Sequence, residues 1–272
     1  MTTEQHEAYL NFALSLAKAA EEQIMPYYRH SAARLKPDGS DVTEADLAAE
    51  GVMRQMIARR FPHHAMLGEE FGVTDSPQER YQWIIDPLDG TTWFVLGVPI
   101  FGVLAALLED NEPIVGVIHL PAMGETVYAA RGFGCWFQAG DAAPTRVDVS
   151  ANVELKDATV SAAGVHGSDL YLGGGEIPYN LTALIRRARK FRFCGDCLQH
   201  ALVCRGRIHA AVDTLMKPWD TAAIIPCIEE AGGIATTVTG KRSNVIYGGS
   251  LLTSCSEPLH REIANLLQRQ DR

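Results

Sequence analysis

Two carboxylates follow an apolar run and precede a glycine and two threonines, in the segment WIIDPLDGTT at residues 83–92. The β-branched residues predict a buried strand that ends at Pro87, so that Asp86 and Asp89 leave the sheet together. Mg²⁺ prefers carboxylate and carbonyl oxygens, and a tight turn would offer it both aspartates and the Leu88 carbonyl. Taken alone, this spacing is equally typical of a surface turn.

The residues after Asp89 are suited to bind a phosphate group. Gly90 lets an anion approach the backbone closely. The N–H groups of Gly90, Thr91 and Thr92 would face that anion from the start of a helix. The segment as a whole therefore predicts a combined metal and phosphate site.

Two further acidic motifs lie far from this segment in the chain. Upstream, Gly68-Glu69-Glu70 follows a short apolar run that predicts another strand, so its glutamates lie at a strand end. Downstream, Asp220 lies near the start of a helix that is predicted over residues 218–231 and ends at a Gly-Gly pair. Acidic groups at strand ends and at a helix start favour a metal site over an ordinary turn.

The expected secondary structure shows how these motifs are positioned. Amphipathic helices are predicted over residues 4–28 and from the N-cap Thr43 to residue 60, which places Asp46 in the first turn of the second helix. Strands with intervening hairpin turns are predicted next, over residues 65–67, 82–85, 101–108, 114–120, 126–130 and 135–138. From residue 158 strands alternate with helices, the strands at 159–163, 191–193, 208–212 and 251–254 and the helices at 177–189, 196–205, 218–231 and 258–267.

The three acidic motifs, in this order, resemble the signatures of the inositol monophosphatase-like family of magnesium-dependent phosphatases. The resemblance implies a layered αβαβα sandwich, in which an α+β half precedes an α/β half and the active site lies between them. We expect the first half over residues 1–150 and the second over residues 151–272. The family also implies two or three Mg²⁺ ions in each active site, and a homodimer.

The resemblance also assigns roles by position. It implies five metal ligands, which are Glu69, Asp86, Leu88 through its carbonyl, Asp89 and Asp220. Thr91 and Asp46 would orient the attacking water, and Asp46 would also serve a weaker third metal site through water. Glu70 would lie just outside the ligands, or would be a solvated acid.

Four segments are similar to the histidinol-phosphate phosphatase branch of this family, and they lie at residues 101–108, 121–125, 193–197 and 215–223. Histidinol phosphate carries an ammonium group and an imidazole, so a carboxylate beside the phosphate would favour it over inositol phosphate. Gly195 and Asp196 are the candidate substrate contacts, and Asp213 lies where the family has an acidic contact. Asp196 is equally suited to be a helix N-cap, and inositol, sugar or nucleotide phosphates remain alternative substrates.

Other functions fit parts of the sequence. Cys194 and Cys197 have the spacing of a thioredoxin-type redox pair, and Cys197, His200 and Cys204 share a helix face that would suit zinc. Neither pattern has the surrounding motifs that such sites require, so packing is the favoured interpretation. A catalytically silent scaffold is a third alternative, against which the intact acidic motifs argue.

Composition excludes several partners. The chain has 272 residues, 47% of them hydrophobic, with 24 basic against 33 acidic residues and a net charge of −9. This charge argues against nucleic acid and anionic membranes as partners, and no apolar run reaches the roughly 18 residues of a spanning helix. We therefore expect a cytoplasmic protein that acts on a small phosphorylated metabolite, and its six cysteines fit a reducing compartment.

Overall fold

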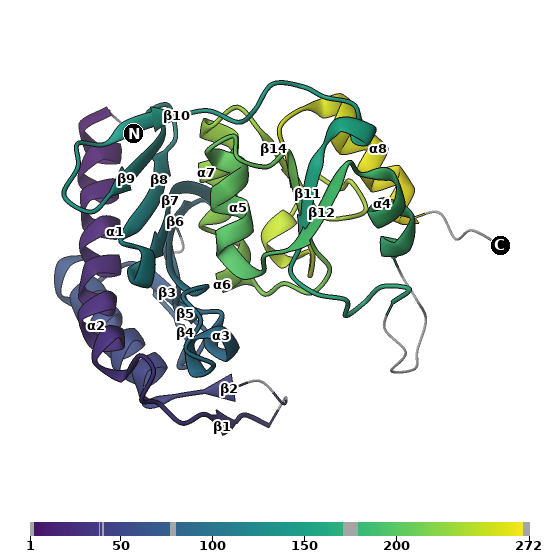
Figure 1. Ribbon diagram of the computed structural model, residues 1–272. Helices are drawn as coiled ribbons and strands as arrows, with labels where there is room; N and C mark the ends of the chain where they lie inside the picture. The colour runs from purple at the N-terminus through teal and green to yellow at the C-terminus, as the bar shows by residue number, and fades with distance from the viewer. Residues whose placement is uncertain (1–2, 38, 40, 77–79, 171–178, 269–272) are drawn as a thin grey trace.

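Helices and sheets alternate in five layers in the computed structural model, which describes residues 3–37, 39, 41–76, 80–170 and 179–268. Two helices cover one face of a larger sheet, further helices lie between this sheet and a smaller one, and two more cover the far face of the smaller sheet (Figure 1). The predicted αβαβα sandwich is thus confirmed. No helix in the described part of the chain is long and apolar enough to cross a membrane.

The larger sheet has eight strands in the order β10-β9-β8-β7-β6-β5-β3-β4. Its strands are β3 (Ala65–Gly68), β4 (Gly72–Thr74), β5 (Tyr81–Asp89), β6 (Gly102–Glu109), β7 (Glu112–Leu120), β8 (Glu125–Ala130), β9 (Gly134–Ala139) and β10 (Thr145–Val147). All neighbours pair antiparallel except β3 and β5, which are parallel. The carboxyl ends of β3 and β5 therefore lie side by side. The acidic motifs at residues 68–70 and 86–89 are located at these two strand ends.

The outer layer on this sheet consists of α1 (Thr3–Ile24) and α2 (Glu44–Arg60). An apolar stripe of α1 that includes Leu16 and Ile24 is fully buried against the sheet. The predicted helix over residues 4–28 ends earlier, because Pro26 has no N–H to continue the ladder, and the chain turns into the 3₁₀ helix η1 (Met25–Tyr27). Thr43 caps α2 as predicted, with its side chain accepting the Ala45 N–H.

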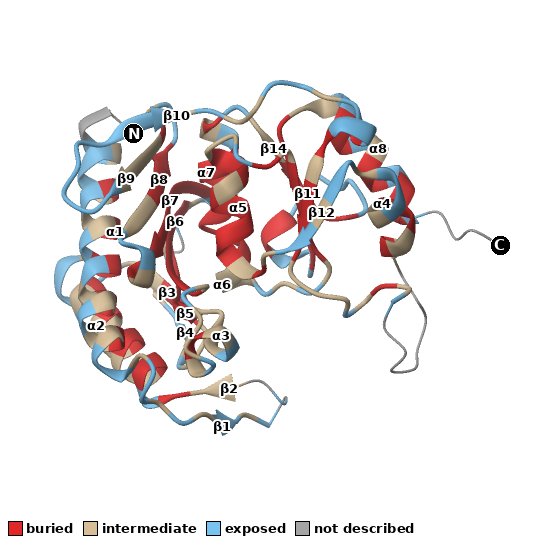
Figure 2. Cartoon of the chain, viewed as in Figure 1, coloured by how far each residue is buried: buried red, intermediate tan, exposed pale blue. Residues whose placement is uncertain are grey.

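The smaller sheet has five strands in the order β12-β11-β13-β15-β14. Its strands are β11 (Thr159–Ala162), β12 (Lys190–Phe193), β13 (Ala210–Asp213), β14 (Ile234–Thr236) and β15 (Leu251–Ser254). The helices between the two sheets are α5 (Asp196–Cys204), α6 (Pro218–Thr221) and α7 (Ile224–Glu230), and the outer ones are α4 (Leu181–Arg187) and α8 (Glu257–Gln268). Buried residues concentrate on both sheets and on α5 and α7 (Figure 2).

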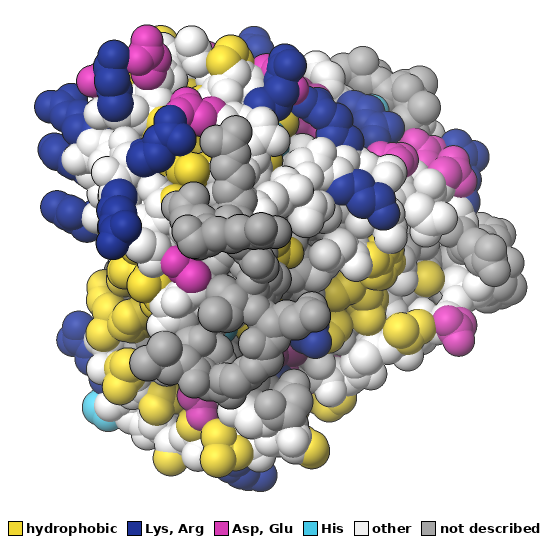
Figure 3. All heavy atoms as spheres, turned by 90° about the vertical axis from the view of Figure 1, so that its right-hand side faces the viewer, with side chains coloured by type: hydrophobic (Ala, Val, Ile, Leu, Met, Phe, Trp, Pro, Cys, Tyr) yellow, Lys and Arg dark blue, Asp and Glu magenta, His cyan; other side chains and the backbone are white. Residues whose placement is uncertain are grey.

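Short elements complete the chain. They are β1 (Arg34–Leu35), β2 (Asp41–Val42), α3 (Thr91–Val95) and the 3₁₀ helices η2 (Pro121–Met123), η3 (Leu155–Asp157) and η4 (Val245–Tyr247). On the outer face of the smaller half, basic and acidic side chains are interspersed among hydrophobic ones (Figure 3). A mixture of this kind is ordinary for a protein surface.

Two further predicted helices differ from the observed ones. The single helix predicted over residues 218–231 is wrong, because α6 ends at Thr221 and α7 begins at Ile224. Pro226 explains the break, since it has no N–H to donate to the Ala222 carbonyl. The helix predicted over residues 177–189 is observed as the shorter α4, which begins at Leu181 and ends at Arg187, and the first two predicted residues lie outside the described ones.

Candidate active site

A cavity of about 320 Å³ lies where the end of β5 meets α3, α6 and the start of α5. Seven carboxylates line it, those of Asp41, Glu69, Asp86, Asp89, Asp196, Asp213 and Asp220. None of its described lining residues is lysine, arginine or histidine. A cleft lined by one sign of charge concentrates ions of the other sign, so this cavity is suited to cations.

An irregularity in β5 presents the first two carboxylates. Asp86 pairs with Leu104 of β6 and Asp89 with Gly102, so β5 has one more residue than its partner at this point. The predicted end of the strand at Pro87 is wrong, because the missing N–H of Pro87 falls within this β-bulge, where a proline is tolerated. The Leu88 N–H donates to Asp86 Oδ1 at 2.9 Å and fixes that side chain.

Asp220 joins these two aspartates from the other half of the chain. Oxygen atoms of Asp86, Asp89 and Asp220 all lie within 4.8 Å of one another. Asp89 Oδ2 accepts the Cys197 N–H at 2.7 Å, and Asp220 Oδ2 accepts the Lys217 N–H at 2.7 Å. Three carboxylates from β5 and α6 are thus held together by backbone donors.

The electrostatics of this group fit a divalent cation. Burial raises the pKa of Asp86 well above its usual range, and the charges of Glu69, Asp89 and Asp220 add to the effect. Burial likewise raises the pKa of Asp220 to about 7. Like charges at this separation are costly unless a cation compensates them, and an all-oxygen donor set suits Mg²⁺.

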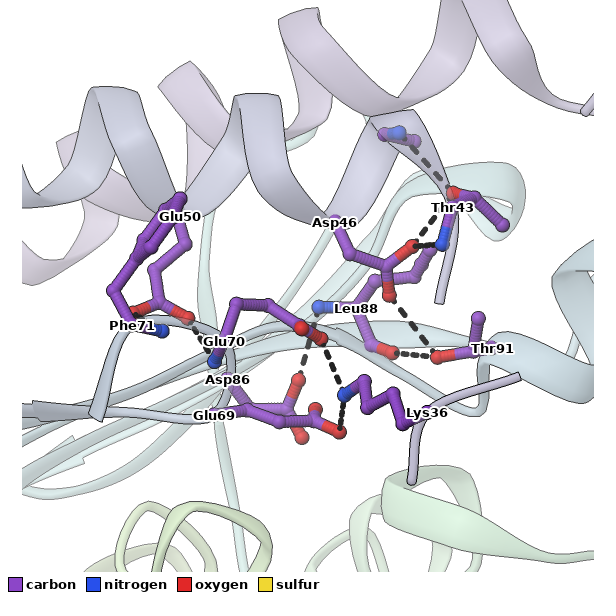
Figure 4. A network of polar contacts seen from close by, with 11 residues as sticks. Lys36, Thr43, Asp46, Glu50, Glu69, Glu70, Phe71, Asp86, Leu88 and Thr91 are labelled. Carbon is purple, nitrogen blue, oxygen red and sulfur yellow. Dashed lines mark hydrogen bonds and ion pairs between the residues drawn. The ribbon is translucent and has the colours of Figure 1, made fainter. Parts of the chain in front are cut away.

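Glu69 lies beside this group and contacts a lysine that the sequence did not point to. Lys36 Nζ is 2.7 Å from Glu69 Oε1 and 2.7 Å from Glu70 Oε1 (Figure 4). Burial raises the pKa of Glu70 to about 7, with a further contribution from the Glu69 charge. Lys36 thus supplies the protein's own positive charge at the end of β3.

A second residue that was not predicted, Glu50, shapes the turn after β3. It is fully buried on α2, and its carboxylate accepts the N–H groups of Glu70 and Phe71 at 2.6 and 3.1 Å. A Cβ on Gly68 would lie 2.1 Å from Glu50 Oε1, so any larger residue there would displace the Glu50 carboxylate. The sequence did contain a signal, because Glu50 follows Asp46 by one helical turn on the buried face of α2.

Thr91 and Asp46, the two residues expected to orient the attacking water, are in contact. The Thr91 hydroxyl lies 3.1 Å from Asp46 Oδ1 and 3.0 Å from the Leu88 carbonyl oxygen (Figure 4). Asp46 is fully buried behind Thr91 and also accepts the Thr43 N–H at 2.8 Å. Gly90 and Thr92 line the cavity with Thr91 at the start of α3.

The two candidate substrate carboxylates, Asp196 and Asp213, also line the cavity, and a Cβ on Gly90 would lie 3.2 Å from Asp196 Oδ2. Gly195, rather than Asp196, is the N-cap of α5, so the N-cap interpretation of Asp196 is wrong. Gly195 lies against Trp93, since a Cβ there would be 3.1 Å from the indole nitrogen. Asp196 Oδ2 is buried and has no hydrogen-bond partner among the described residues. Burial and the charge of Asp213 raise the Asp196 pKa to about 7.

The structure does not support the redox and zinc alternatives. Cys194 and Cys197 are both free thiols, and burial raises the pKa of Cys197 well above its usual range. A redox-active cysteine requires the opposite shift, because the thiolate is the nucleophile. His200 binds Asp213 and Thr253, and the described residues bring no Cys/His ligand group together.

These pKa shifts predict how pH alters the stabilisation by Mg²⁺. Folding raises the pKa of Asp196 and that of Asp220 to about 7. Such a carboxyl group stabilises the metal-free fold while it is protonated, fully so below about pH 4, and this stabilisation is lost as pH rises through about 7. Since Mg²⁺ competes with these protons, the rise in melting temperature on adding Mg²⁺ should be larger near pH 8 than near pH 5. Thermal denaturation with Mg²⁺ or with a chelator measures this, and equal rises at both pH values would contradict it.

The chain matches the model of the inositol monophosphatase family over residues 5–272. It is 38% identical over 256 residues to a histidinol-phosphatase of Chlorobaculum parvum, across 93% of this chain and 94% of that protein. It is also 38% identical over 260 residues to a histidinol-phosphatase of Mycobacterium tuberculosis, across 95% and 97% of the two chains. The solved structure of a Thermotoga maritima IMPase superimposes with a TM-score of 0.79 at 29% identity, across 95% and 96%. The similarity therefore extends over the complete fold.

Proposed function

Because this chain belongs to the inositol monophosphatase family, a family of phosphoric monoester hydrolases, we propose that its substrate is histidinol phosphate and its product histidinol. The observation that carries this proposal is the cavity lined by seven carboxylates. Three of them are grouped for a divalent cation, while Asp196 has a buried carboxylate oxygen with no hydrogen-bond partner among the described residues. The names of the two relatives at 38% identity support the choice of substrate.

The enzyme depends on a divalent metal, and we propose how its residues hold the metal and the phosphate. The proposed ligands are Glu69, Asp86, the Leu88 carbonyl, Asp89 and Asp220. When bound, the metal neutralises phosphate oxygens and makes a water molecule more acidic. The first turn of α3 is proposed to bind the phosphate through the N–H groups of Gly90, Thr91 and Thr92.

Thr91 and Asp46 are proposed to orient the attacking water. Thr91 lines the cavity, and its hydroxyl is bonded to the Asp46 carboxylate. Asp46 is itself held by the backbone and side chain of Thr43. This chain of contacts fixes the Thr91 oxygen, and positioning of the nucleophile supplies much of the rate in phosphoryl transfer.

Asp196 is proposed to bind the cationic end of the substrate. An unpaired carboxylate oxygen in a low-dielectric wall costs free energy, and an ammonium or imidazolium group would compensate it. Trp93 lies beside Asp196 in the wall, and an aromatic face also attracts a cation. Asp213 is proposed as the second substrate contact. Inositol phosphate has only hydroxyl groups to offer to the same wall.

The remaining parts of the proposal rest on family membership. They are a division of the chain at about residue 150, two or three Mg²⁺ ions in each active site, a homodimer and a cytoplasmic location. The proposed division would give the second half only Asp220 among the metal ligands. Both halves would then be needed for a complete site.

A substrate panel in the presence of Mg²⁺ tests the proposed function. We expect kcat/KM for histidinol phosphate to exceed the values for inositol 1-phosphate, fructose 1,6-bisphosphate and adenosine 3′,5′-bisphosphate by about a hundredfold, since a buried charged contact is worth about 1.5–3 kcal/mol. Released phosphate is the measurement. A preference for any of the other three esters would contradict the proposal.

Replacing Asp196 by asparagine serves as the internal control of this panel. The substitution keeps the shape of the side chain and removes its charge, so the loss should be large for histidinol phosphate and small for inositol 1-phosphate. Equal losses of kcat/KM with both esters would show that Asp196 does not recognise the positive charge of the substrate.

A further inference from the structure

Asp213 has an asymmetric set of hydrogen bonds at the cavity wall. It lies at the end of β13 and its residue is 4% exposed. Gln199 Nε2 donates to its Oδ2 at 2.5 Å, and His200 Nε2 lies 2.7 Å from the same atom. Both hydrogen bonds that the described residues make to this carboxylate therefore end on one oxygen, and Oδ1 is left for a ligand in the cavity.

The second nitrogen of His200 is also held. His200 and Thr253 are both fully buried, and His200 Nδ1 lies 2.9 Å from the Thr253 hydroxyl of β15. A carboxylate only accepts hydrogen bonds, so Nε2 carries the hydrogen that is donated to Asp213. The Thr253 hydroxyl can then donate to Nδ1, which fixes the ring orientation and the tautomer.

Asp213 needs such support because its surroundings repel it. Its charge contributes to the raised pKa values of Asp196 and Asp220, which places the three carboxylates within electrostatic reach of one another. Like charges nearby destabilise an ionised carboxylate, and hydrogen bonds donated to its oxygens offset this cost. Gln199 and His200 are adjacent on α5, so one turn of this helix supplies both donors.

From this geometry we propose that His200 is a positioning residue for substrate recognition. With Gln199, it holds Asp213 Oδ2 so that Oδ1 faces the leaving-group side of the cavity, where it accepts a hydrogen bond from a hydroxyl or ammonium group of the substrate. The proposal rests on the proposed function, because it requires that the phosphate ester is cleaved in this cavity. It assigns His200 to substrate binding and not to the chemical step.

The test compares two esters on His200→Leu, with histidinol phosphate as one substrate and phenyl phosphate as the other. Phenyl phosphate has no polar group on its leaving side. We expect KM for histidinol phosphate to rise about tenfold, the usual effect of losing one hydrogen bond, while kcat/KM for phenyl phosphate stays within about twofold. His200→Gln, which keeps an N–H donor, should restore most of the affinity.

His260→Leu is the matched control. His260 is also a buried histidine of the smaller half, and its ring nitrogens lie 2.8 Å from the hydroxyls of Thr236 and Ser254, away from the active-site cavity. The His260→Leu variant should have a lower melting temperature than the wild-type protein but an unchanged KM for histidinol phosphate. A rise in KM equal to that of His200→Leu would overturn the proposal, because loosening of the sheet alone would then explain both.

A double substitution tests whether His200 acts through Asp213. In the Asp213→Ala background, His200→Leu should have almost no further effect on KM, and a full tenfold effect there would overturn the proposal. If His200→Leu does not fold, Gln199→Leu removes the other donor to the same oxygen and carries the same expectations.

Failure of the proposed function has a different signature. Wild-type protein would then leave histidinol phosphate intact while cleaving another ester of the panel. The same variants would then be measured with that ester and with phenyl phosphate, because the leaving group of that ester would contact the same oxygen, Asp213 Oδ1.

Discussion

Asp89→Asn is expected to lower magnesium-dependent phosphate release by about a thousandfold, equivalent to about 4 kcal/mol of transition-state stabilisation. The amide keeps an oxygen that accepts the Cys197 N–H but removes one negative charge from the group with Asp86 and Asp220. Steady-state kinetics with the preferred ester measures the loss.

The same substitution should leave the fold intact and change the response to metal. Burial raises the pKa of Asp89 well above its usual range, and the charges of Asp196 and Asp220 add to the effect. Removing this charge should therefore raise the melting temperature of the metal-free protein and diminish the further rise caused by Mg²⁺. Asp110→Asn, in the turn between β6 and β7 with a φ of 51° that asparagine tolerates, is the control. Normal turnover by Asp89→Asn would eliminate the proposed metal centre.

Gly116→Ala is expected to destabilise the protein by about 3 kcal/mol, at the upper end for overpacking a core. Gly116 lies in β7 where α7 packs against the larger sheet. A Cβ there would lie 2.1 Å from the Ala223 carbonyl oxygen and 2.7 Å from Pro226 Cγ. Because the nearest atom belongs to the backbone, α7 as a whole must move. The midpoint of urea unfolding measures the effect.

Gly51→Ala provides a control of opposite sign. Gly51 lies inside α2, and a Cβ there would have no neighbour within 4 Å. Alanine should therefore stabilise the protein by about 0.5–1 kcal/mol through its helix propensity. Equal small changes in stability from both substitutions would contradict the expected cost of overpacking between β7 and α7.

The local parts of the site were predictable from sequence because short-range rules determine them. The apolar run before Asp86 predicts a strand, and Thr43 predicts the start of the helix that carries Asp46. The break between α6 and α7 was also readable, since Pro226 alone accounts for it. The path of β5 through Pro87 was not, because it depends on the register with β6.

The convergence of the motifs could be expected only from the family resemblance. Nothing local brings Asp220 to Asp86, and the contact forms because α6 packs against β5. Lys36 was missed for a related reason, as its partners Glu69 and Glu70 lie more than thirty residues away. Asp213 was named as a substrate contact, yet its support by His200 was not foreseen, because a histidine on an apolar helix face is ordinarily a packing residue.

One short helix positions both a proposed metal ligand and a proposed substrate contact. At its first turn α5 holds Asp89 through the Cys197 amide, and two and three residues further along it holds Asp213 through Gln199 and His200. A displacement of α5 along its own axis would therefore disturb ion affinity and leaving-group choice in a single event. Adaptation of this enzyme to a new ester is easiest by exchanging side chains on the cavity wall while the helix itself stays in register.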